Sequence, residues 1–345
     1  MMDRSTPILA LVVPCYNEEK ALPETIAALD SLLDSLIADR RIAPQSRAVF
    51  VDDGSRDGTW SIINGHAASN PRVCGLKLSF NAGHQSALMA GMMESRENVD
   101  CIISIDADLQ HDIGVLPEML RLFAEGSDIV IGVRVNRAGD SPMKRYFSNM
   151  FYKAMKKIGI PLGEQHADFR LLCRNVLDAL YCYPERNLFL RGIIATMGFQ
   201  TATVPYVQRE RIQGVSKYSL RKMLSLAWNG ITSFSALPLR ISAVLSLLTL
   251  VWTLFLALNT LFSYFMGQTV SGWSSLMLTM LFLGAIQLFC IAVLGEYTAK
   301  IYIEVKRRPY YIVEKKSFGS FSQDGREAEK HSISPDTSRD FSSRG

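Results

Sequence analysis

Three aspartates follow a run of apolar residues at 101–112, CIISIDADLQHD, where Asp106, Asp108 and Asp112 fall within seven positions. Carboxylates this close repel one another and raise one another's pKa. A divalent cation would offset the repulsion, and Mg²⁺ or Mn²⁺ prefers carboxylate oxygens while leaving room for phosphate oxygens. The spacing therefore predicts a metal that binds a diphosphate and stabilises its charge as it leaves.

Two further polar clusters also follow apolar runs. PCYNEE places Tyr16 and Glu18 after one run, and VDDGSRDGT places Asp52 and Asp53 after another. Such side chains can accept hydrogen bonds from a base and a ribose. An Asp-x-Asp alone is also typical of a surface turn, so the combination of clusters is what favours a nucleotide site. No G-x-G-x-x-G or G-x-x-x-x-G-K-[ST] occurs, which argues against a dinucleotide fold and an NTPase-type phosphate loop.

The elements that would carry these clusters alternate along the chain. Apolar runs predict buried strands at 8–13, 48–51, 73–78, 101–105 and 129–132, and helical periodicity predicts helices at 22–37, 85–93 and 115–123. This alternation predicts an α/β fold with a mostly parallel sheet covered on both faces. Ligands of such sheets bind at the carboxyl ends of strands, where the polar clusters fall. Residues 140–215 have a mixed pattern and stay unassigned.

No charged residue lies between Arg240 and Glu296. Residues 241–266 would form a helix about 39 Å long at ~1.5 Å per residue, and residues 273–295 are also long enough to cross a hydrocarbon core about 30 Å thick. We expect a transmembrane hairpin rather than two buried core helices. Basic residues mark the cytoplasmic side of a membrane, and they flank both ends: Arg221, Lys222, Arg240, Lys300, Lys306, Arg307, Arg308, Lys315 and Lys316.

The pattern divides the chain into four parts. Residues 1–215 would form the α/β domain, 216–240 an amphipathic juxtamembrane helix, 241–314 the hairpin with a basic extension, and 315–345 a disordered polar tail. The apolar face within 217–234 favours an interfacial position, although a helix packed on the soluble domain would show the same face.

Composition excludes several classes of protein. At 345 residues, 48% hydrophobic and 20% charged, the chain folds into one large or two modest domains. The net charge of +4 is too modest to imply a nucleic-acid partner. Six cysteines without a C-x-x-C pair argue against a zinc site or a disulfide framework and suit a reducing cytosol.

The ordered motifs PCYNEE, VDDGSRDGT, NAGHQSALMAG and DADLQ resemble glycosyltransferase family 2. The later segments ADFRLLCRNV, RNLFLRGI and LGEYTAKIYIEVKRRPYYIV are similar to bacterial polyprenyl-phosphate glycosyltransferases, relatives of dolichyl-phosphate mannose synthase with a two-helix anchor. The resemblance covers residues 8–314 and implies a GT-A-type fold. Two departures stand out: His111, Asp112 and Ile113 replace a frequent proline, and QHAD replaces a frequent glycine before DFRL, so that His166 is either an acceptor contact or a structural histidine.

The resemblance also implies roles for individual residues. Asp108 and Gln110, with help from Asp106, would bind the metal. The catalytic residues would be Asp108 and Asp168, with Asp168 as the base. Alternatively, Asp168 would orient Arg170 or the phosphate. Arg134 and Arg145 would face the acceptor phosphate. The implied nucleotide-sugar contacts are Pro14, Tyr16, Glu18, Val51, Asp53, Asp106, Ala107, Asp108, Gln110, Arg134 and Lys217.

The implied reaction is inverting transfer from a UDP-sugar to polyprenyl (undecaprenyl) phosphate, giving a lipid-linked sugar for lipopolysaccharide or cell-wall modification. Glucose is the first expectation, while N-acetylglucosamine, galactose and aminoarabinose derivatives stay open. The expected location is the bacterial inner membrane, among membrane lipids, with the catalytic domain cytoplasmic. Self-association as a homo-oligomer is expected through small residues such as Ser246, Gly284 and Ala285.

Three other functions are weighed against this one. A processive polysaccharide synthase would carry a Q-x-x-R-W motif, which is missing, and more spans. A non-catalytic membrane scaffold would be marked by loss of the Asp-x-Asp, which is intact. A flippase or channel would need a polar path, and the two spans contain no charge.

Overall fold

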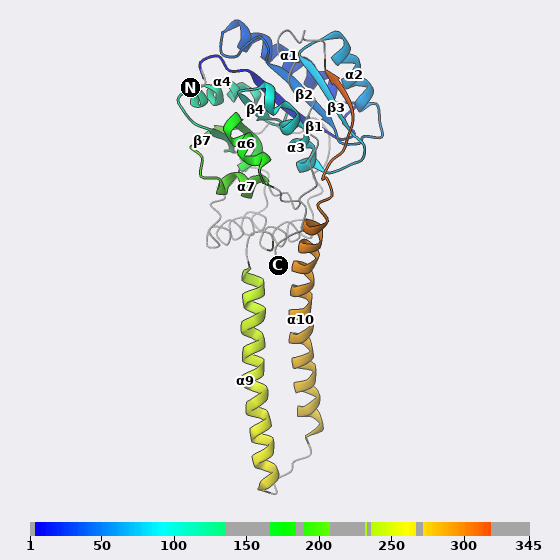
Figure 1. Cartoon of the computed structure of the whole chain (residues 1–345), viewed down its shortest axis with the longest axis vertical. Helices are drawn as coiled ribbons and strands as arrows, with labels where there is room; N and C mark the ends of the chain where they lie inside the picture. Colours follow the sequence, from blue (N-terminus) through cyan, green and yellow to red (C-terminus); the bar gives the residue numbers. More distant parts are fainter. Residues whose placement is uncertain are drawn as a thin grey trace, which may run out of the picture.

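The computed structural model describes residues 4–135, 166–183, 190–207, 232, 236–266 and 272–318. A layered α/β domain lies at one end, and two long helices lead away from it (Figure 1). Apart from Thr232, the predicted interfacial helix 217–234 lies outside the described residues, as do Arg145, Lys217 and the tail from 319 onward.

Eight strands form one sheet in the order β7-β5-β6-β4-β1-β2-β3-β8. The central strands β4, β1, β2 and β3 are mutually parallel, whereas β6 and β8 run antiparallel to their neighbours. The predicted α/β class and mostly parallel sheet are therefore confirmed. The strands are β1 Leu9–Cys15, β2 Arg47–Asp52, β3 Val73–Leu78, β4 Cys101–Ser104, β5 Ile129–Arg134, β6 His166–Cys173, β7 Thr201–Tyr206 and β8 Val313–Phe318.

Helices cover this sheet and bury their apolar faces on it. All seven residues of β1 are buried, as expected for a parallel strand covered on both faces. In α1 the predicted face is buried at Leu22, Ile26, Leu29, Leu33 and Leu36. The helices of this domain are α1 Leu22–Ala38, α2 Thr59–Ser69, α3 His84–Ser95, α4 Leu116–Ala124, α6 Arg174–Tyr181 and α7 Leu190–Thr196, with short 3₁₀ turns η1 Arg96–Asn98 and η2 Ile113–Val115.

Helix α3 packs unusually close to the sheet. A Cβ atom at Gly91 would lie 2.4 Å from Val12 Cγ1 and 2.9 Å from Val51 Cγ2. A glycine without a side chain therefore permits this approach. Gly83, directly before the helix, has φ 91, a conformation that side chains other than glycine rarely adopt. These two glycines set where α3 begins, and with it the position of His84.

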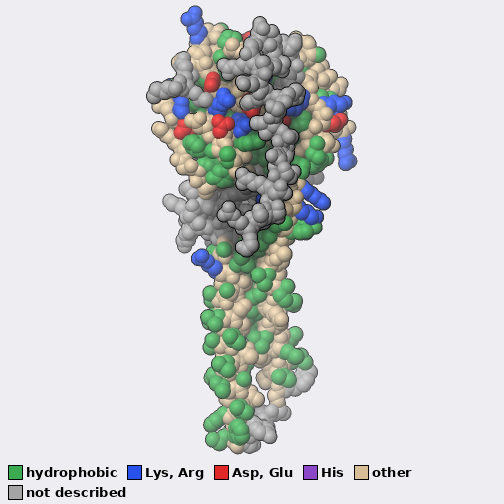
Figure 2. Space-filling view, viewed as in Figure 1, with side chains coloured by type: hydrophobic (Ala, Val, Ile, Leu, Met, Phe, Trp, Pro, Cys, Tyr) green, Lys and Arg blue, Asp and Glu red, His purple; other side chains and the backbone are tan. Residues whose placement is uncertain are grey.

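The two long helices are α9 Leu237–Phe265 and α10 Trp273–Lys306. Each contains a segment long and apolar enough to cross a membrane, Leu237–Ser263 with a mean hydropathy of 2.3 and Ser275–Lys306 with 2.4. Hydrophobic side chains line both helices on the face shown in Figure 2, and charged side chains gather at the sheet end. Ser246 Oγ lies 3.5 Å from Cys290 Sγ of α10. Ser246, expected to contact another copy, thus contacts its own chain, while Gly284 has open space beside it.

The chain returns to the sheet after α10. Strand β8 pairs antiparallel with β3, and the Ser79 N–H donates to the Ile312 carbonyl at 2.9 Å. Lys77 Nζ lies 2.9 Å from Glu314 Oε2, and Lys316 pairs with Glu94. The prediction that residues 315–318 belong to a disordered tail is therefore wrong. A polar composition is what an edge strand needs on its solvent side, so it does not by itself indicate disorder.

Candidate active site

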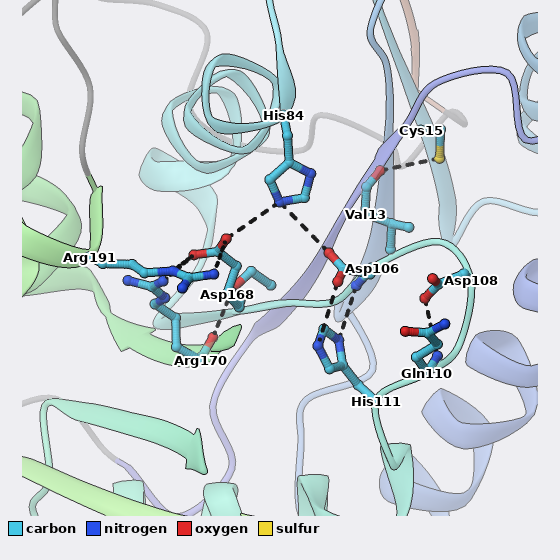
Figure 3. Close-up of polar contacts among 11 residues, drawn as sticks. Val13, Cys15, His84, Asp106, Asp108, Gln110, His111, Asp168, Arg170 and Arg191 are labelled. Atoms are coloured by element: carbon cyan, nitrogen blue, oxygen red, sulfur yellow. Dashed lines mark hydrogen bonds and ion pairs between the residues drawn. The ribbon is translucent and has the colours of Figure 1, made fainter. Parts of the chain in front are cut away.

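The predicted polar clusters meet at one edge of the sheet. The loop after β4 carries Asp106 and Asp108, and β6 brings Asp168 beside it, because Ser104 and Arg170 are register partners. The start of α3 contributes His84 from above this edge (Figure 3). Three separate segments thus place carboxylates, histidines and the guanidinium group of Arg170 in one cluster.

The loop after β4 turns back on itself. Leu109 has φ 50, and Asp108 Oδ1 accepts a hydrogen bond from the Gln110 N–H at 3.2 Å. Thr25 of α1 donates to the Ala107 carbonyl at 2.7 Å, which ties the loop to the neighbouring helix. Asp112 Oδ1 accepts from the Gly114 N–H at 3.1 Å and caps η2. Asp112 therefore stabilises the local fold, while Asp106 and Asp108 remain partly exposed.

Two histidines face the carboxylate of Asp106. His84 Nε2 lies 3.7 Å from Asp106 Oδ1, and His111 Nε2 lies 3.5 Å from Oδ2. Burial lowers the pKa of His111, although the carboxylates of Asp106 and Asp108 act in the opposite direction. Sequence reasoning assigned neither histidine to the site. The signal for His84 was its place after the third parallel strand, at the edge where ligands bind.

Two guanidinium groups and an imidazole surround the carboxylate of Asp168. Arg191 Nε and Nη2 donate to its two oxygens at 3.0 Å each, and Arg170 Nη2 donates to Oδ1. His84 Nε2 lies 3.7 Å from Asp168 Oδ2. Burial alone would raise the pKa of Asp168, but the charges of Arg170 and Arg191 outweigh it and hold the pKa well below its usual value. Asp168 is thus a permanent carboxylate at neutral pH, and Arg191 was missed by sequence reasoning.

The adjacent residues Asp52 and Asp53 do different things. Asp53 Oδ1 and Oδ2 accept the N–H groups of Ala82 and Gly83 at 2.7 and 3.0 Å, directly before α3. Burial raises the pKa of Asp53, and those two hydrogen bonds oppose the rise. Asp52 is fully buried; its Oδ1 accepts from the Ser55 N–H, and its Oδ2 has no hydrogen-bond partner among the described residues. A nucleotide contact by Asp53 stays a prediction.

The remaining predicted residues are spread around this edge. Pro14 and Val51 are register partners inside β1 and β2 and are buried, whereas Tyr16 is 43% exposed just beyond β1. The Glu18 N–H is held by Thr59 Oγ1 at 2.9 Å. Arg134 ends β5 opposite Tyr206. Arg145 and Lys217 lie outside the described residues, so their roles stay predictions.

The described residues contain no group of three or more His, Cys, Asp or Glu side chains that could hold a metal ion. The predicted set of Asp106, Asp108 and Gln110 instead offers two carboxylates and an amide oxygen on one loop. Oxygen donors of this kind suit Mg²⁺ or Mn²⁺, which bind through one or two carboxylates plus substrate phosphates. The residues present therefore fit a metal that arrives with a diphosphate.

The family described as glycosyl transferase family 2 matches residues 10–181. The uncharacterized glycosyltransferase YkoT of Bacillus subtilis is 45% identical over 313 residues, covering 91% of this chain and 93% of that protein. The SfII prophage-derived bactoprenol glucosyl transferase of Shigella flexneri is 40% identical over 320 residues, covering 90% and 99%.

Among solved structures, the mannosyltransferase PcManGT from Pyrobaculum calidifontis in complex with GDP-Man and Mn²⁺ has a TM-score of 0.45. It is 18% identical, covering 89% of this chain and 88% of that chain. The sequence relatives align over almost their whole lengths, and the family match extends from β1 to α6. The chain therefore belongs to glycosyltransferase family 2 and is a glycosyltransferase.

Proposed function

We propose that the chain transfers a hexose, with glucose as the first candidate, from a UDP-sugar to polyprenyl phosphate. The observation that carries this proposal is the 40% identity to a bactoprenol glucosyl transferase over 90% of this chain. An alignment of that extent includes the two long apolar helices as well as the sheet. The product would be a lipid-linked sugar for modification of lipopolysaccharide or the cell wall.

The nucleotide of the donor would lie along the ends of β1 and β2. Asp52 is fully buried behind these strand ends and accepts the Ser55 N–H, so it would hold the loop after β2 rather than contact the nucleotide. The exposed ring of Tyr16 at the neighbouring strand end can cover the base. Asp53, with both oxygens bonded to backbone, would act by holding the loop before α3.

The diphosphate would lie over the loop after β4. Asp108 and Asp106, with Gln110, would hold Mg²⁺ or Mn²⁺, which neutralises charge on the departing UDP. The phosphate oxygen of the acceptor attacks the anomeric carbon while the bond from that carbon to the UDP oxygen breaks. A single displacement of this kind inverts the anomeric centre.

The acceptor needs little help from a base. A phosphate monoester has a second pKa of about 6, so it is largely dianionic at neutral pH. Asp168, with its lowered pKa, is a poor proton acceptor and is proposed to orient Arg170 and Arg191 instead. Arg191 is 35% exposed and His84 is 46% exposed on the same side, and guanidinium groups bind phosphate well. Arg134 and Arg145 remain proposed acceptor contacts.

The two long helices would anchor the enzyme in the bacterial inner membrane as a hairpin. Most of their large apolar side chains are exposed, which is unfavourable in water. Exposed basic residues lie at the sheet end of both helices, at Arg240, Arg307 and Arg308. By the distribution of basic residues the catalytic domain is cytoplasmic, where UDP-sugars are made.

The test is a donor panel. Membranes containing the protein are incubated with undecaprenyl phosphate and each of several radiolabelled UDP-sugars, and label in the organic phase is counted. The expected result is label from UDP-glucose, with a β-linked anomeric signal by NMR if α-linked UDP-glucose is inverted. Label from another UDP-sugar alone would replace glucose as the donor. Absence of lipid-linked label with every donor would overturn the proposed transfer to polyprenyl phosphate.

A further inference from the structure

The ring of His111 is fixed in an aromatic cluster. Its side chain is 5% exposed and stacks on Phe169, with ring centroids 4.8 Å apart and an interplanar angle of 7°. The ring of Tyr206 meets the same imidazole edge-on at 5.6 Å. Phe169 and Tyr206 are themselves buried in β6 and β7. The orientation of the imidazole is therefore set by side chains of the sheet as well as by the loop after β4 that carries His111.

Both nitrogens of that ring face one residue. The Asp106 N–H donates to His111 Nδ1 at 3.3 Å, and His111 Nε2 lies 3.5 Å from Asp106 Oδ2 (Figure 3). A nitrogen that accepts a hydrogen bond carries no proton, so the proton of the neutral ring is on Nε2. This proton points toward the carboxylate, and the imidazole engages the backbone and the side chain of Asp106 together.

We propose that His111 is a positioning residue that presents Asp106 to the nucleotide sugar. With Oδ2 turned toward the imidazole, Oδ1 is the oxygen left facing His84 and the space beside Asp168. The loop from 106 to 112 contains no proline to stiffen it and has Leu109 in the left-handed region. His111 supplies the rigidity from outside the loop. The inference rests on the proposed function, since it assigns a donor to this cluster.

Three substitutions separate the contacts of the ring. His111→Phe keeps the stack on Phe169 and removes both nitrogens. His111→Gln can place a donor near the position of Nε2, and His111→Asn can place an acceptor near the position of Nδ1. His66→Phe is the matched control, because His66 lies exposed on α2, outside the cluster. Each variant is measured for kcat, for donor KM, for thermal unfolding, and for UDP binding with Mn²⁺ by calorimetry.

Positioning residues behind a metal ligand typically affect affinity or activity about 10–100-fold. We expect His111→Phe to lower kcat and Mn²⁺-dependent UDP affinity within that range, His111→Gln to recover most of the loss, and His66→Phe to change neither quantity. A folded His111→Phe protein with wild-type kcat and UDP affinity would overturn the inference. Equal losses in the Phe and Gln variants that track their unfolding temperatures would also overturn it, by showing a purely structural ring.

The binding measurement separates this inference from the proposed acceptor. UDP binding with Mn²⁺ needs no lipid, so a protein that binds UDP through His111 but glycosylates no polyprenyl phosphate would refute only the proposed function. A wild-type protein that binds no UDP would refute both. If His111→Phe does not fold, the kcat and UDP affinity of the Gln and Asn variants are compared instead. The inference predicts higher values for His111→Gln, since only the Gln side chain can reach the Asp106 carboxylate. Equal values in the two variants would overturn it.

Discussion

Aspartates of this site have the same chemistry but different surroundings, and the surroundings set what each can do. Asp108 is partly exposed, and its Oδ1 accepts a hydrogen bond from the Gln110 N–H of the same loop. Asp53 directs both oxygens to backbone N–H groups. Asp168 is closed in by two guanidinium groups. Among the described aspartates of this site, Asp106 and Asp108 are the two that we expect to meet a cation from solvent, so they are the carboxylates to substitute first.

Asp108→Asn should lower turnover by orders of magnitude. The amide removes the negative charge that a divalent cation requires, yet its oxygen can still accept the Gln110 N–H. We expect the unfolding temperature to stay near that of the wild type, while transfer with saturating Mn²⁺ is lost. Full activity of this variant in EDTA would contradict the metal assignment. The same assay on Asp112→Asn is the control, since Asp112 caps η2.

Asp168→Asn should destabilise the fold at neutral pH. Asp168 and Arg170 are 12% and 5% exposed, and removing one partner of a buried ion pair costs about 3–5 kcal/mol. Because the pKa of Asp168 is lower in the folded protein than the unfolded value of about 3.9, its carboxylate stabilises the fold fully at pH values above the unfolded pKa. This stabilisation is lost as the pH falls toward the folded-state pKa. The stability difference between wild type and variant should therefore be constant from about pH 8 to pH 5 and shrink only in stronger acid.

Urea unfolding of the detergent-solubilised proteins at several pH values measures this difference. A stability difference that disappears near pH 6 would show that Asp168 titrates there, as a general base would. Glu125→Gln serves as a control, because Glu125 forms its ion pair on the exposed face of α4. Exposed pairs contribute little, so this variant should follow the wild-type curve.

At the scale of elements, Gly91→Ala should show that the packing of α3 positions the site. The new Cβ would lie 2.4 Å from Val12 Cγ1, and overpacking of this kind typically costs about 1–3 kcal/mol. Helix α3 must move away from β1, and it carries His84 with it, so both stability and kcat should fall. Gly65→Ala on α2 is the matched control. Apart from its chain neighbours and the backbone of its own helix, no atom lies within 4 Å of the new Cβ, so the substitution should be neutral or stabilising by about 0.5–1 kcal/mol.

The sequence was sufficient to predict the elements with strong periodicity. All five predicted strands are present, because buried parallel strands are nearly continuous apolar runs. Helix α2 was not predicted, since TWSIINGHAAS buries only Thr59, Ile63 and Ala67. Strand β6 was missed because its polar residues Asp168 and Arg170 neutralise each other inside the sheet, a pairing across space that no local pattern reveals.

The same limit applies to the site. The aspartates were predictable because strand ends of a parallel sheet converge by topology. The partners of those aspartates were not, because His84 and Arg191 reach them from α3 and α7, whose packing depends on tertiary contacts. His111 was visible in the sequence only as a departure from a frequent proline. Its contact with Asp106 depends on Phe169 and Tyr206, which lie much later in the chain.

At the scale of the whole molecule, the hairpin predicts a labelling pattern in intact cells. A cysteine introduced by Gly272→Cys, just before α10, should react with a membrane-impermeant maleimide from outside, in a background with Cys182 and Cys290 replaced. A reporter should be fused beyond residue 318, because earlier fusion would interrupt β8, and it should report the cytoplasm. The reverse pattern would overturn the topology and the use of a cytoplasmic UDP-sugar.

The position of β8 also dictates the order in which the protein can be assembled. Its residues are synthesised after both long helices, yet they complete the sheet that β1 began near the N-terminus. Until they emerge from the ribosome, β3 presents an open edge, and open edges pair readily with other chains. If α9 and α10 anchor the chain as proposed, the nascent domain stays incomplete while these helices enter the bilayer. A chain terminated before residue 313 should aggregate more readily than one terminated after 318, because only the longer one can cover the β3 edge with the polar strand β8.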